Sequence, residues 1–245
     1  MKRIVNWKSF FILLAVCVIG SILVMPFQTA LSPALAELWM KLYIAAIVQS
    51  LIIFPPAIFF GLILAKKTGF SLPILEGENK RKCFIAILTP SILRGAFGGV
   101  LVILLSLPFW GVSLELLKAE MAVPTWAGFL AALYGGVAEE VLFRLFLMSL
   151  FVWIAMKIKI PRNVGVWAAI IITGIIFGLG HLPITGELTA ITSDIVLRAI
   201  LLNGSVSIIF GWLYWKKGLE SAMIAHFSVD MVLHVITPLV ARLFI

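Results

Sequence analysis

The sequence has 245 residues, of which 62% are hydrophobic and 12% are charged, and its mean hydropathy is +1.16. Soluble domains contain about 45–50% apolar and about 25% charged residues, so this composition excludes a soluble globular protein and indicates an integral membrane protein. The net charge is +8, but the cations cluster in short loops rather than on one polar face. This distribution argues against nucleic-acid binding and is typical of membrane topology.

Seven apolar segments are long enough to cross a bilayer, which takes about 20 residues of helix. The segment 188–215 contains Asn203-Gly204 and can be divided there into two helices. The sequence therefore predicts an all-α polytopic transmembrane bundle of seven or eight spans. Without repeats, low-complexity segments or a separate soluble region, we expect one membrane domain over residues 1–245. The seven segments are about 9–26, 42–65, 83–109, 126–156, 164–181, 188–215 and 219–237.

The basic residues predict the orientation of this bundle. They precede the first span and follow the second, fourth and sixth, whereas the other loops are mostly acidic. Because cytoplasmic loops are enriched in lysine and arginine, we expect a cytoplasmic N-terminus. The expected location of the protein is the plasma membrane of a prokaryote. Ala34-Leu35-Ala36 resembles a signal-peptide cleavage site, but the apolar run before it exceeds the usual length of about 7–15 residues, so we expect the first span to be retained.

Three charged residues lie inside the fourth segment, in the run GGVAEEVLFR (135–144). One charge at a bilayer centre costs about 2.5–3.5 kcal/mol, so three without compensation would cost roughly 7–10 kcal/mol. Glu140 and Arg144 are four residues apart and can pair on one helix face, whereas Glu139 points about 100° away. Glu139 therefore has no cation on its own helix and is suited to act as a general base. The alternative is a structural ion cluster that fixes helix packing.

The histidines all lie in the last third of the chain. His181 ends the run FGLGH, and His226 and Asp230 share one helix face in HFSVD, where Asp230 can orient His226. Imidazoles can donate a proton or stabilise an oxyanion, so these groups and Glu139 together could activate a water for hydrolysis. The alternatives are an interfacial histidine at a helix end and a hydrogen-bonded packing pair. The remaining histidine, His234, fits no motif, and we interpret it as structural.

Three motifs resemble those of a known family. EEVLFR (139–144) matches the EExxxR motif of the CAAX protease and bacteriocin-processing family, also called the Abi family of intramembrane proteases. FGLGH (177–181) matches its FxxxH motif, and HFSVD (226–230) matches its third motif, Hxxx followed by Asn or Asp. Their order and placement on successive late spans also match. The resemblance covers a catalytic core of about 126–237, and the first 125 residues match only in general character.

The resemblance implies an intramembrane endopeptidase that hydrolyses peptide bonds of membrane-associated or prenylated, CAAX-type, proteins or peptides. It implies that Glu139 activates the water, with help from His181 and His226. Where the third motif commonly has Asn, this chain has Asp230, and a carboxylate near two histidines is a usual zinc set. A divalent metal such as zinc held by Glu139, His181, His226 and Asp230 is therefore an alternative, although we favour a mechanism without metal.

We thus expect Glu139 as general base, supported by the pair of Glu140 and Arg144. His181 would be a proton donor or second water ligand, and His226 with Asp230 would form the oxyanion side. The expected partners are the lipid bilayer and a membrane-associated substrate, and not nucleic acid. A proton-coupled transporter is the alternative from another class, since buried ionisable groups relay protons, but its expected sequence repeats are absent. A non-catalytic bacteriocin self-immunity protein is a further alternative, which the intact motifs disfavour.

Two further features bear on packing. The glycines of Gly135-Gly136 and of the stretch 95–99 are interpreted as close helix contacts. Counting at about 1.5 Å per residue from the basic loops places Glu139 and His181 roughly 26 Å deep, but His226 only about 12 Å deep. These three residues would share one site only if the span boundaries differ from those given, or if the fifth helix is tilted or ends in a loop that dips into the membrane.

Overall fold

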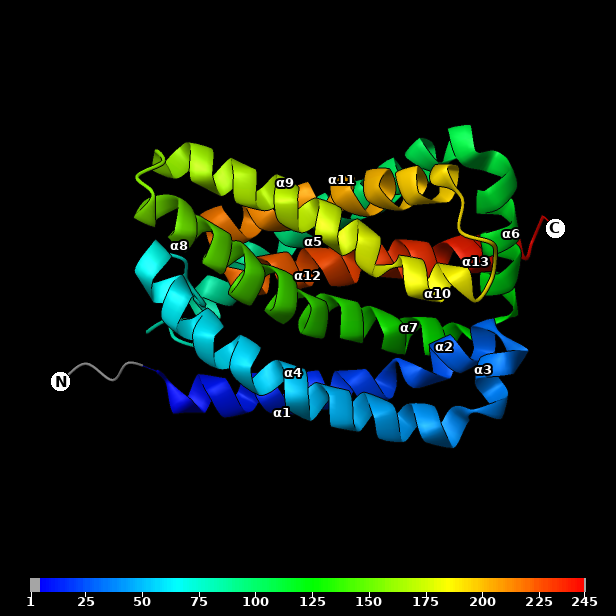
Figure 1. The fold of residues 1–245 in the computed structure, drawn as a ribbon, viewed down its shortest axis with the longest axis horizontal. Helices are drawn as coiled ribbons and strands as arrows, with labels where there is room; N and C mark the ends of the chain where they lie inside the picture. Colours follow the sequence, from blue (N-terminus) through cyan, green and yellow to red (C-terminus); the bar gives the residue numbers. More distant parts are fainter. Residues whose placement is uncertain (1–4, 245) are drawn as a thin grey trace.

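The fold was analysed in a computed structural model, which describes residues 5–244. Throughout these residues the chain is helical or irregular, and it forms a bundle without β-strands (Figure 1). Six helices are long and apolar enough to cross a membrane, at Trp7–Leu31, Trp39–Thr68, Lys80–Ala122, Arg162–Gly186, Ser193–Lys217 and Leu219–Ala241. A seventh helical segment, residues 125–157, contains the charged triplet and runs along the same bundle (Figure 1). The all-α polytopic architecture is therefore confirmed.

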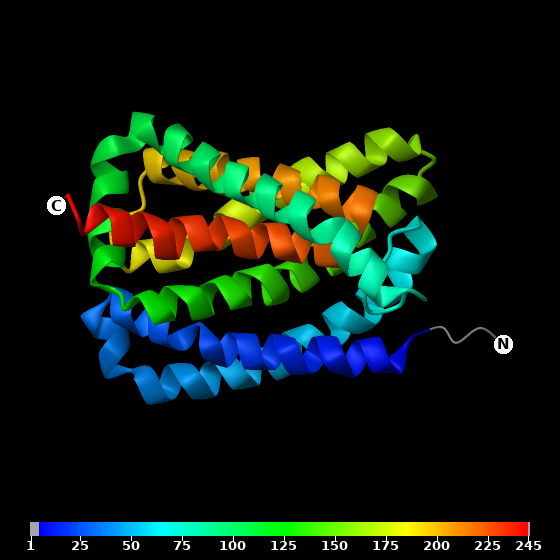
Figure 2. The same ribbon diagram turned by 180° about the vertical axis from the view of Figure 1, so that it is seen from behind.

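The segments follow one another back and forth along the long axis of the bundle (Figures 1 and 2). The predicted segment 188–215 is one unbroken helix, α11, so its division at Asn203-Gly204 is not observed. The α-helices are α1 (Trp7–Leu23), α2 (Met25–Leu31), α3 (Pro33–Glu37), α4 (Trp39–Thr68), α5 (Lys80–Ser106), α6 (Trp110–Ala122), α7 (Thr125–Tyr134), α8 (Ser149–Lys157), α9 (Arg162–Gly180), α10 (Leu182–Gly186), α11 (Ser193–Lys217), α12 (Leu219–Asp230) and α13 (Thr237–Ala241).

Four shorter helical elements interrupt or join these helices. A 3₁₀ turn, η1 (Leu107–Phe109), bends the chain between α5 and α6, so that α6 runs across one end of the bundle (Figure 1). Pro108 accounts for this bend, because proline has no backbone N–H to continue the hydrogen bonding of α5. The other three are π-helical: η2 (Gly135–Glu139), η3 (Val141–Met148) and η4 (Met231–Ile236). Wide turns of this kind occur frequently at functional sites.

The start of α12 is recessed beneath the loop 69–79. Gly218 connects α11 to α12 with a φ of 97°, a conformation that favours glycine. Beyond it, the Leu219 amide donates to the Ser71 carbonyl at 3.0 Å. The Glu220 carboxylate accepts hydrogen bonds from the amides of Ile74 at 2.9 Å and Leu75 at 2.8 Å. These contacts bury the first turn of α12, so this helix begins inside the bundle rather than at its end.

Glycines allow α12 and its neighbours to approach closely. A side chain at Gly95 of α5 would meet the Ala225 carbonyl and the Ser228 side chain of α12. A side chain at Gly136 would lie 2.9 Å from the Cβ of Phe227, also on α12. The prediction that these glycines mark close helix contacts is therefore confirmed. Small residues at such contacts are the usual basis of helix packing in membranes, where both lipid and protein are apolar.

Candidate active site

Glu140 and Arg144 form the buried base of the site. Neither side chain is exposed, and Arg144 Nε lies 3.4 Å from Glu140 Oε2. The Arg144 guanidinium also donates to Ser207 Oγ on α11 at 2.8 Å. It lies between the rings of Phe177 and Phe210, with its carbon 5.3 Å and 5.2 Å from the two ring centres. The predicted pair is therefore present, and the aromatic rings and Ser207 fix the position of its cation.

His226 joins this base to the cavity. Its Nδ1 lies 2.8 Å from Glu140 Oε1, and because a carboxylate accepts, Nδ1–H is the donor. The ring stacks on Phe210 at 4.4 Å with an interplanar angle of 17°, and it meets the edge of Phe177 at 5.5 Å. Glu140 therefore makes the orienting contact expected from Asp230. The reason is geometric, since Nδ1 faces Glu140, between η2 and η3, and only Nε2 turns toward the cavity.

The second glutamate and the aspartate both face His226 Nε2. Glu139 Oε2 lies 3.7 Å and Asp230 Oδ2 lies 3.6 Å from that nitrogen. The two glutamates thus differ as expected, since Glu140 is fully buried while 21% of the Glu139 side chain is exposed. Gly135 makes this arrangement possible, because a Cβ there would collide with the Asp230 carboxylate and lie 3.2 Å from His226 Nε2.

Two features bring Glu139 and His226 to the same depth in the bundle, although counting residues from the basic loops places them at different depths. The first is the recessed start of α12 beneath the loop 69–79, which places His226 deeper than a count from Gly218 indicates. The second is the π-helical character of η2 and η3, which uses more residues per turn than an α-helix. The helix that contains Glu139 therefore rises less per residue between the site and its basic end.

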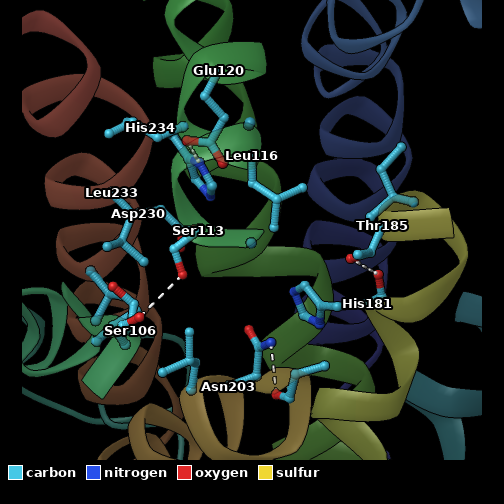
Figure 3. Close-up of a pocket in the computed structure, with 18 of the residues that line it drawn as sticks. Ser106, Ser113, Leu116, Glu120, His181, Thr185, Asn203, Asp230, Leu233 and His234 are labelled. Atoms are coloured by element: carbon cyan, nitrogen blue, oxygen red, sulfur yellow. Dashed lines mark hydrogen bonds and ion pairs between the residues drawn. The ribbon is translucent and has the colours of Figure 1, made fainter. Parts of the chain in front are cut away.

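His181 lines the cavity from the end of α9. Its Nδ1 lies 2.8 Å from the Phe177 carbonyl, which can only accept, so Nδ1 carries the hydrogen and Nε2 is left for another partner. The cavity has a volume of about 360 Å³ and is also lined by Glu139, His226 and Asp230. Figure 3 shows the His181 ring pointing into this space from the side opposite Asp230. The structure thus brings all of the predicted site residues to this cavity or directly beneath it.

Several residues of the site belong to none of the three motifs. Ser207 and Phe210 of α11 hold Arg144, but nothing in their local sequence distinguishes them from other residues of an apolar helix. His234, interpreted as structural, lies 3.2 Å from Glu120 Oε2 through its Nδ1 and lines the cavity (Figure 3). The pairing of His234 with Glu120 joins η4 to α6, and this contact fits a structural role for His234. It could not be predicted from the sequence, because the two residues are 114 positions apart.

The four residues of the alternative zinc set, Glu139, His181, His226 and Asp230, all line the cavity. Within residues 5–244, no group of three or more His, Cys, Asp or Glu side chains is placed to hold a metal ion. His226 gives Nδ1 to Glu140, and its Nε2 is 3.6–3.7 Å from the nearest carboxylates.

Comparison with known proteins shows a similarity of this region to one family. Residues 121–232 match the family model described as Type II CAAX prenyl endopeptidase Rce1-like. Comparisons with curated proteins and with solved structures found no match. The matched region contains the two glutamates, Arg144, both motif histidines and Asp230. Residues 121–232 are therefore similar to the Rce1-like family of type II CAAX prenyl endopeptidases, in agreement with the resemblance of the three motifs.

Proposed function

We propose that this protein is an intramembrane endopeptidase that hydrolyses peptide bonds of membrane-associated peptides or proteins. The observation that carries the proposal is the division of labour between two adjacent glutamates. Glu140 is held by Arg144 and His226 beneath the cavity, whereas Glu139 faces the cavity 3.7 Å from His226 Nε2. A site with one fixed and one available carboxylate matches what a hydrolase needs in order to activate a water.

In the proposed reaction, Glu139 removes a proton from a water that lies between its carboxylate and the substrate. The water oxygen forms a bond to the peptide carbonyl carbon, which gives a tetrahedral intermediate with a negatively charged oxygen. Collapse of this intermediate breaks the C–N bond, and the proton taken by Glu139 passes to the departing amine. General-base assistance of this kind contributes about 10²–10⁴-fold to a rate.

The histidines assist this reaction in different ways. In its protonated form, His226 donates from Nδ1 to Glu140 and presents Nε2–H to the developing oxyanion. His181 gives its Nδ1–H to the Phe177 carbonyl, so its Nε2 accepts a hydrogen bond from the attacking water. This assignment makes His181 a water ligand rather than a proton donor. Asp230 lies on the cavity side of His226 and adds a second acceptor for water.

A cleavage assay with purified protein tests the proposal. The protein in detergent is incubated with a panel of prenylated and unprenylated membrane peptides, and the products are identified by mass spectrometry. Glu139→Gln should lower the rate by at least about 10²-fold. Glu78→Gln is the matched control, because Glu78 is exposed in the loop 69–79 and far from the cavity. Equal cleavage by wild type and Glu139→Gln, or cleavage of no peptide by the wild type, would contradict the proposal.

The same assay separates the metal alternative. Treatment with a chelator should leave the rate of the wild-type protein unchanged if Glu139 and the two histidines act without a metal. Loss of activity with chelator, and its recovery on addition of zinc, would instead assign these residues to a metal centre that forms when the ion binds.

A further inference from the structure

We propose that the site receives its substrate from the side of the membrane that faces away from the cytoplasm. The cleaved peptide bond would then belong to a segment that has already crossed the membrane or lies at its outer surface, rather than to a cytoplasmic prenylated protein. This inference rests on the proposed function and adds the side from which the substrate enters. It depends on the charge at the two ends of the bundle and on where the cavity opens.

The two ends of the bundle differ strongly in charge. The end with the N-terminus contains eleven cations among the described residues, and the acids there are Glu76, Glu78 and the buried Glu220. The opposite end contains four cations and five acids. Because positive charge marks cytoplasmic loops, the end with the N-terminus faces the cytoplasm. Its cations are Lys8, Lys66, Lys67, Lys80, Arg81, Lys82, Lys157, Lys159, Arg162, Lys216 and Lys217; the other end has Lys41, Lys118, Arg198, Arg242, Glu37, Glu115, Glu120, Glu187 and Asp194.

The cavity reaches the surface at the weakly charged end. Its outer part is lined by residues of α2, η1, α6 and α10, and these elements all lie at the end opposite the N-terminus (Figures 1 and 2). Two of the lining residues, Leu107 and Trp110, are 52% and 59% exposed. The wall at this end is partly polar, with Ser113 on α6 and Thr185 on α10 facing the cavity (Figure 3).

The path from the site toward the basic end is closed. Arg144 and Phe210 lie directly beneath His226, and neither is exposed. One layer further, Ser149 Oγ and the Tyr214 hydroxyl are 2.9 Å apart and also fully buried. The loop 69–79 then covers the start of α12 through Glu220. A peptide arriving from the basic end would have to separate these packed layers, whereas the other end is open.

The element at the opening also indicates the kind of substrate. α6 runs across the end of the bundle rather than along it (Figure 1), and it begins with the exposed Trp110. Tryptophan is enriched at membrane–water interfaces, so this helix lies at the interface on the side away from the cytoplasm. A substrate segment lying in that interface, either anchored by a neighbouring span or amphipathic, can enter the cavity past Leu107 and Trp110.

Cysteine labelling of the full chain in intact cells tests the side of entry. Cys83→Ser removes the one partly exposed native thiol, and Cys17 is fully buried. Single cysteines are then introduced as Ser113→Cys in the cavity wall, Lys118→Cys on exposed α6 and Lys82→Cys at the basic end. With a membrane-impermeant maleimide, the first two should react in intact cells, and Lys82→Cys only after permeabilisation. The reverse pattern, or reaction of Ser113→Cys only after permeabilisation, would overturn the inference.

A second measurement links this access to cleavage. Purified Ser113→Cys is treated with a bulky maleimide before incubation with the peptide panel, and Lys82→Cys is treated in parallel. We expect modification of Ser113→Cys to slow cleavage at least about 10-fold and modification of Lys82→Cys to leave it unchanged. Inhibition through Lys82→Cys alone would overturn the inference. Because labelling requires no catalysis, an inactive wild-type protein would refute the proposed function while the labelling pattern still decided the side of entry.

Discussion

The same substitution at two adjacent glutamates should have very different consequences for stability. Glu140→Gln removes a negative charge that has no exposure and leaves Arg144 buried without its counter-ion. Glu139→Gln removes a charge that faces the cavity and has no arginine or lysine within 4.0 Å among the described residues. We therefore expect Glu140→Gln to be strongly destabilising and Glu139→Gln to leave stability nearly unchanged, although both should lower activity.

The magnitude for Glu140→Gln follows from its surroundings. Breaking a buried ion pair by removing one partner costs about 3–5 kcal/mol, because the remaining charge stays buried. Arg144 keeps its hydrogen bond to Ser207 Oγ and its contacts with Phe177 and Phe210, which places the expected loss near the lower limit, at about 3 kcal/mol. This is a large part of a typical unfolding free energy of about 5–15 kcal/mol.

The assay is unfolding by SDS titration in mixed micelles, followed by tryptophan fluorescence, for both single variants. Arg144→Met and the double variant Glu140→Gln/Arg144→Met complete a double-mutant cycle. Since the double variant contains no unpaired charge, it should be more stable than the sum of the single losses predicts, by about 1–3 kcal/mol. The reasoning would be refuted if Glu140→Gln were as stable as Glu139→Gln, or if the losses were simply additive.

Three further predictions concern contacts around the site. Gly135→Ala would place a Cβ against the Asp230 carboxylate, so it should reduce the rate of cleavage at least about 10-fold. Gly111→Ala is the control, because a Cβ there has no neighbour within 4 Å, and it should leave the rate unchanged. Equal rates for the two variants would contradict this prediction. Glu220→Ala would remove the acceptor of two loop amides, at about 1–3 kcal/mol for each unsatisfied group, so limited proteolysis should cut the loop 69–79 faster than in wild type. Ser207→Ala should lower the unfolding free energy by about 1–3 kcal/mol in the SDS titration, because a charge-assisted hydrogen bond to Arg144 is lost; an unchanged midpoint would argue against that bond.

Interactions within one helix could be predicted from the sequence. The spacing of Glu140 and Arg144 indicates a pair four residues apart, and the structure places their side-chain atoms 3.4 Å apart. The glycines near positions 95 and 135 indicate close helix contacts, which the structure also contains. These predictions succeed because the facing direction of a residue within one helix depends mainly on its position in the repeat.

Interactions between helices could not be predicted in the same way. The partner of His226 Nδ1 is 86 positions away, and the choice between Glu140 and Asp230 depends on how α12 is rotated against η3. Likewise, the depth of His226 depends on the loop 69–79, whose local sequence does not indicate that it covers the start of another helix. The hydrogen bonds from this loop to Glu220 are what place the start of α12 inside the bundle.

The π-helical turns η2 and η3 determine how the helical segment 125–157 tolerates the insertion or removal of residues. In a regular α-helix each residue advances the facing direction by about 100°, so one direction fixes all the others. Each π-helical turn departs from this rotation of about 100° per residue. As a result, α7 can face α1 and η4 while α8 faces α4 and α9. Removing a single residue such as Val137 would allow the regular repeat to form and would turn Glu139 away from His226. Insertions and deletions between Gly135 and Met148 should therefore be far more damaging than the same changes at either end of the segment.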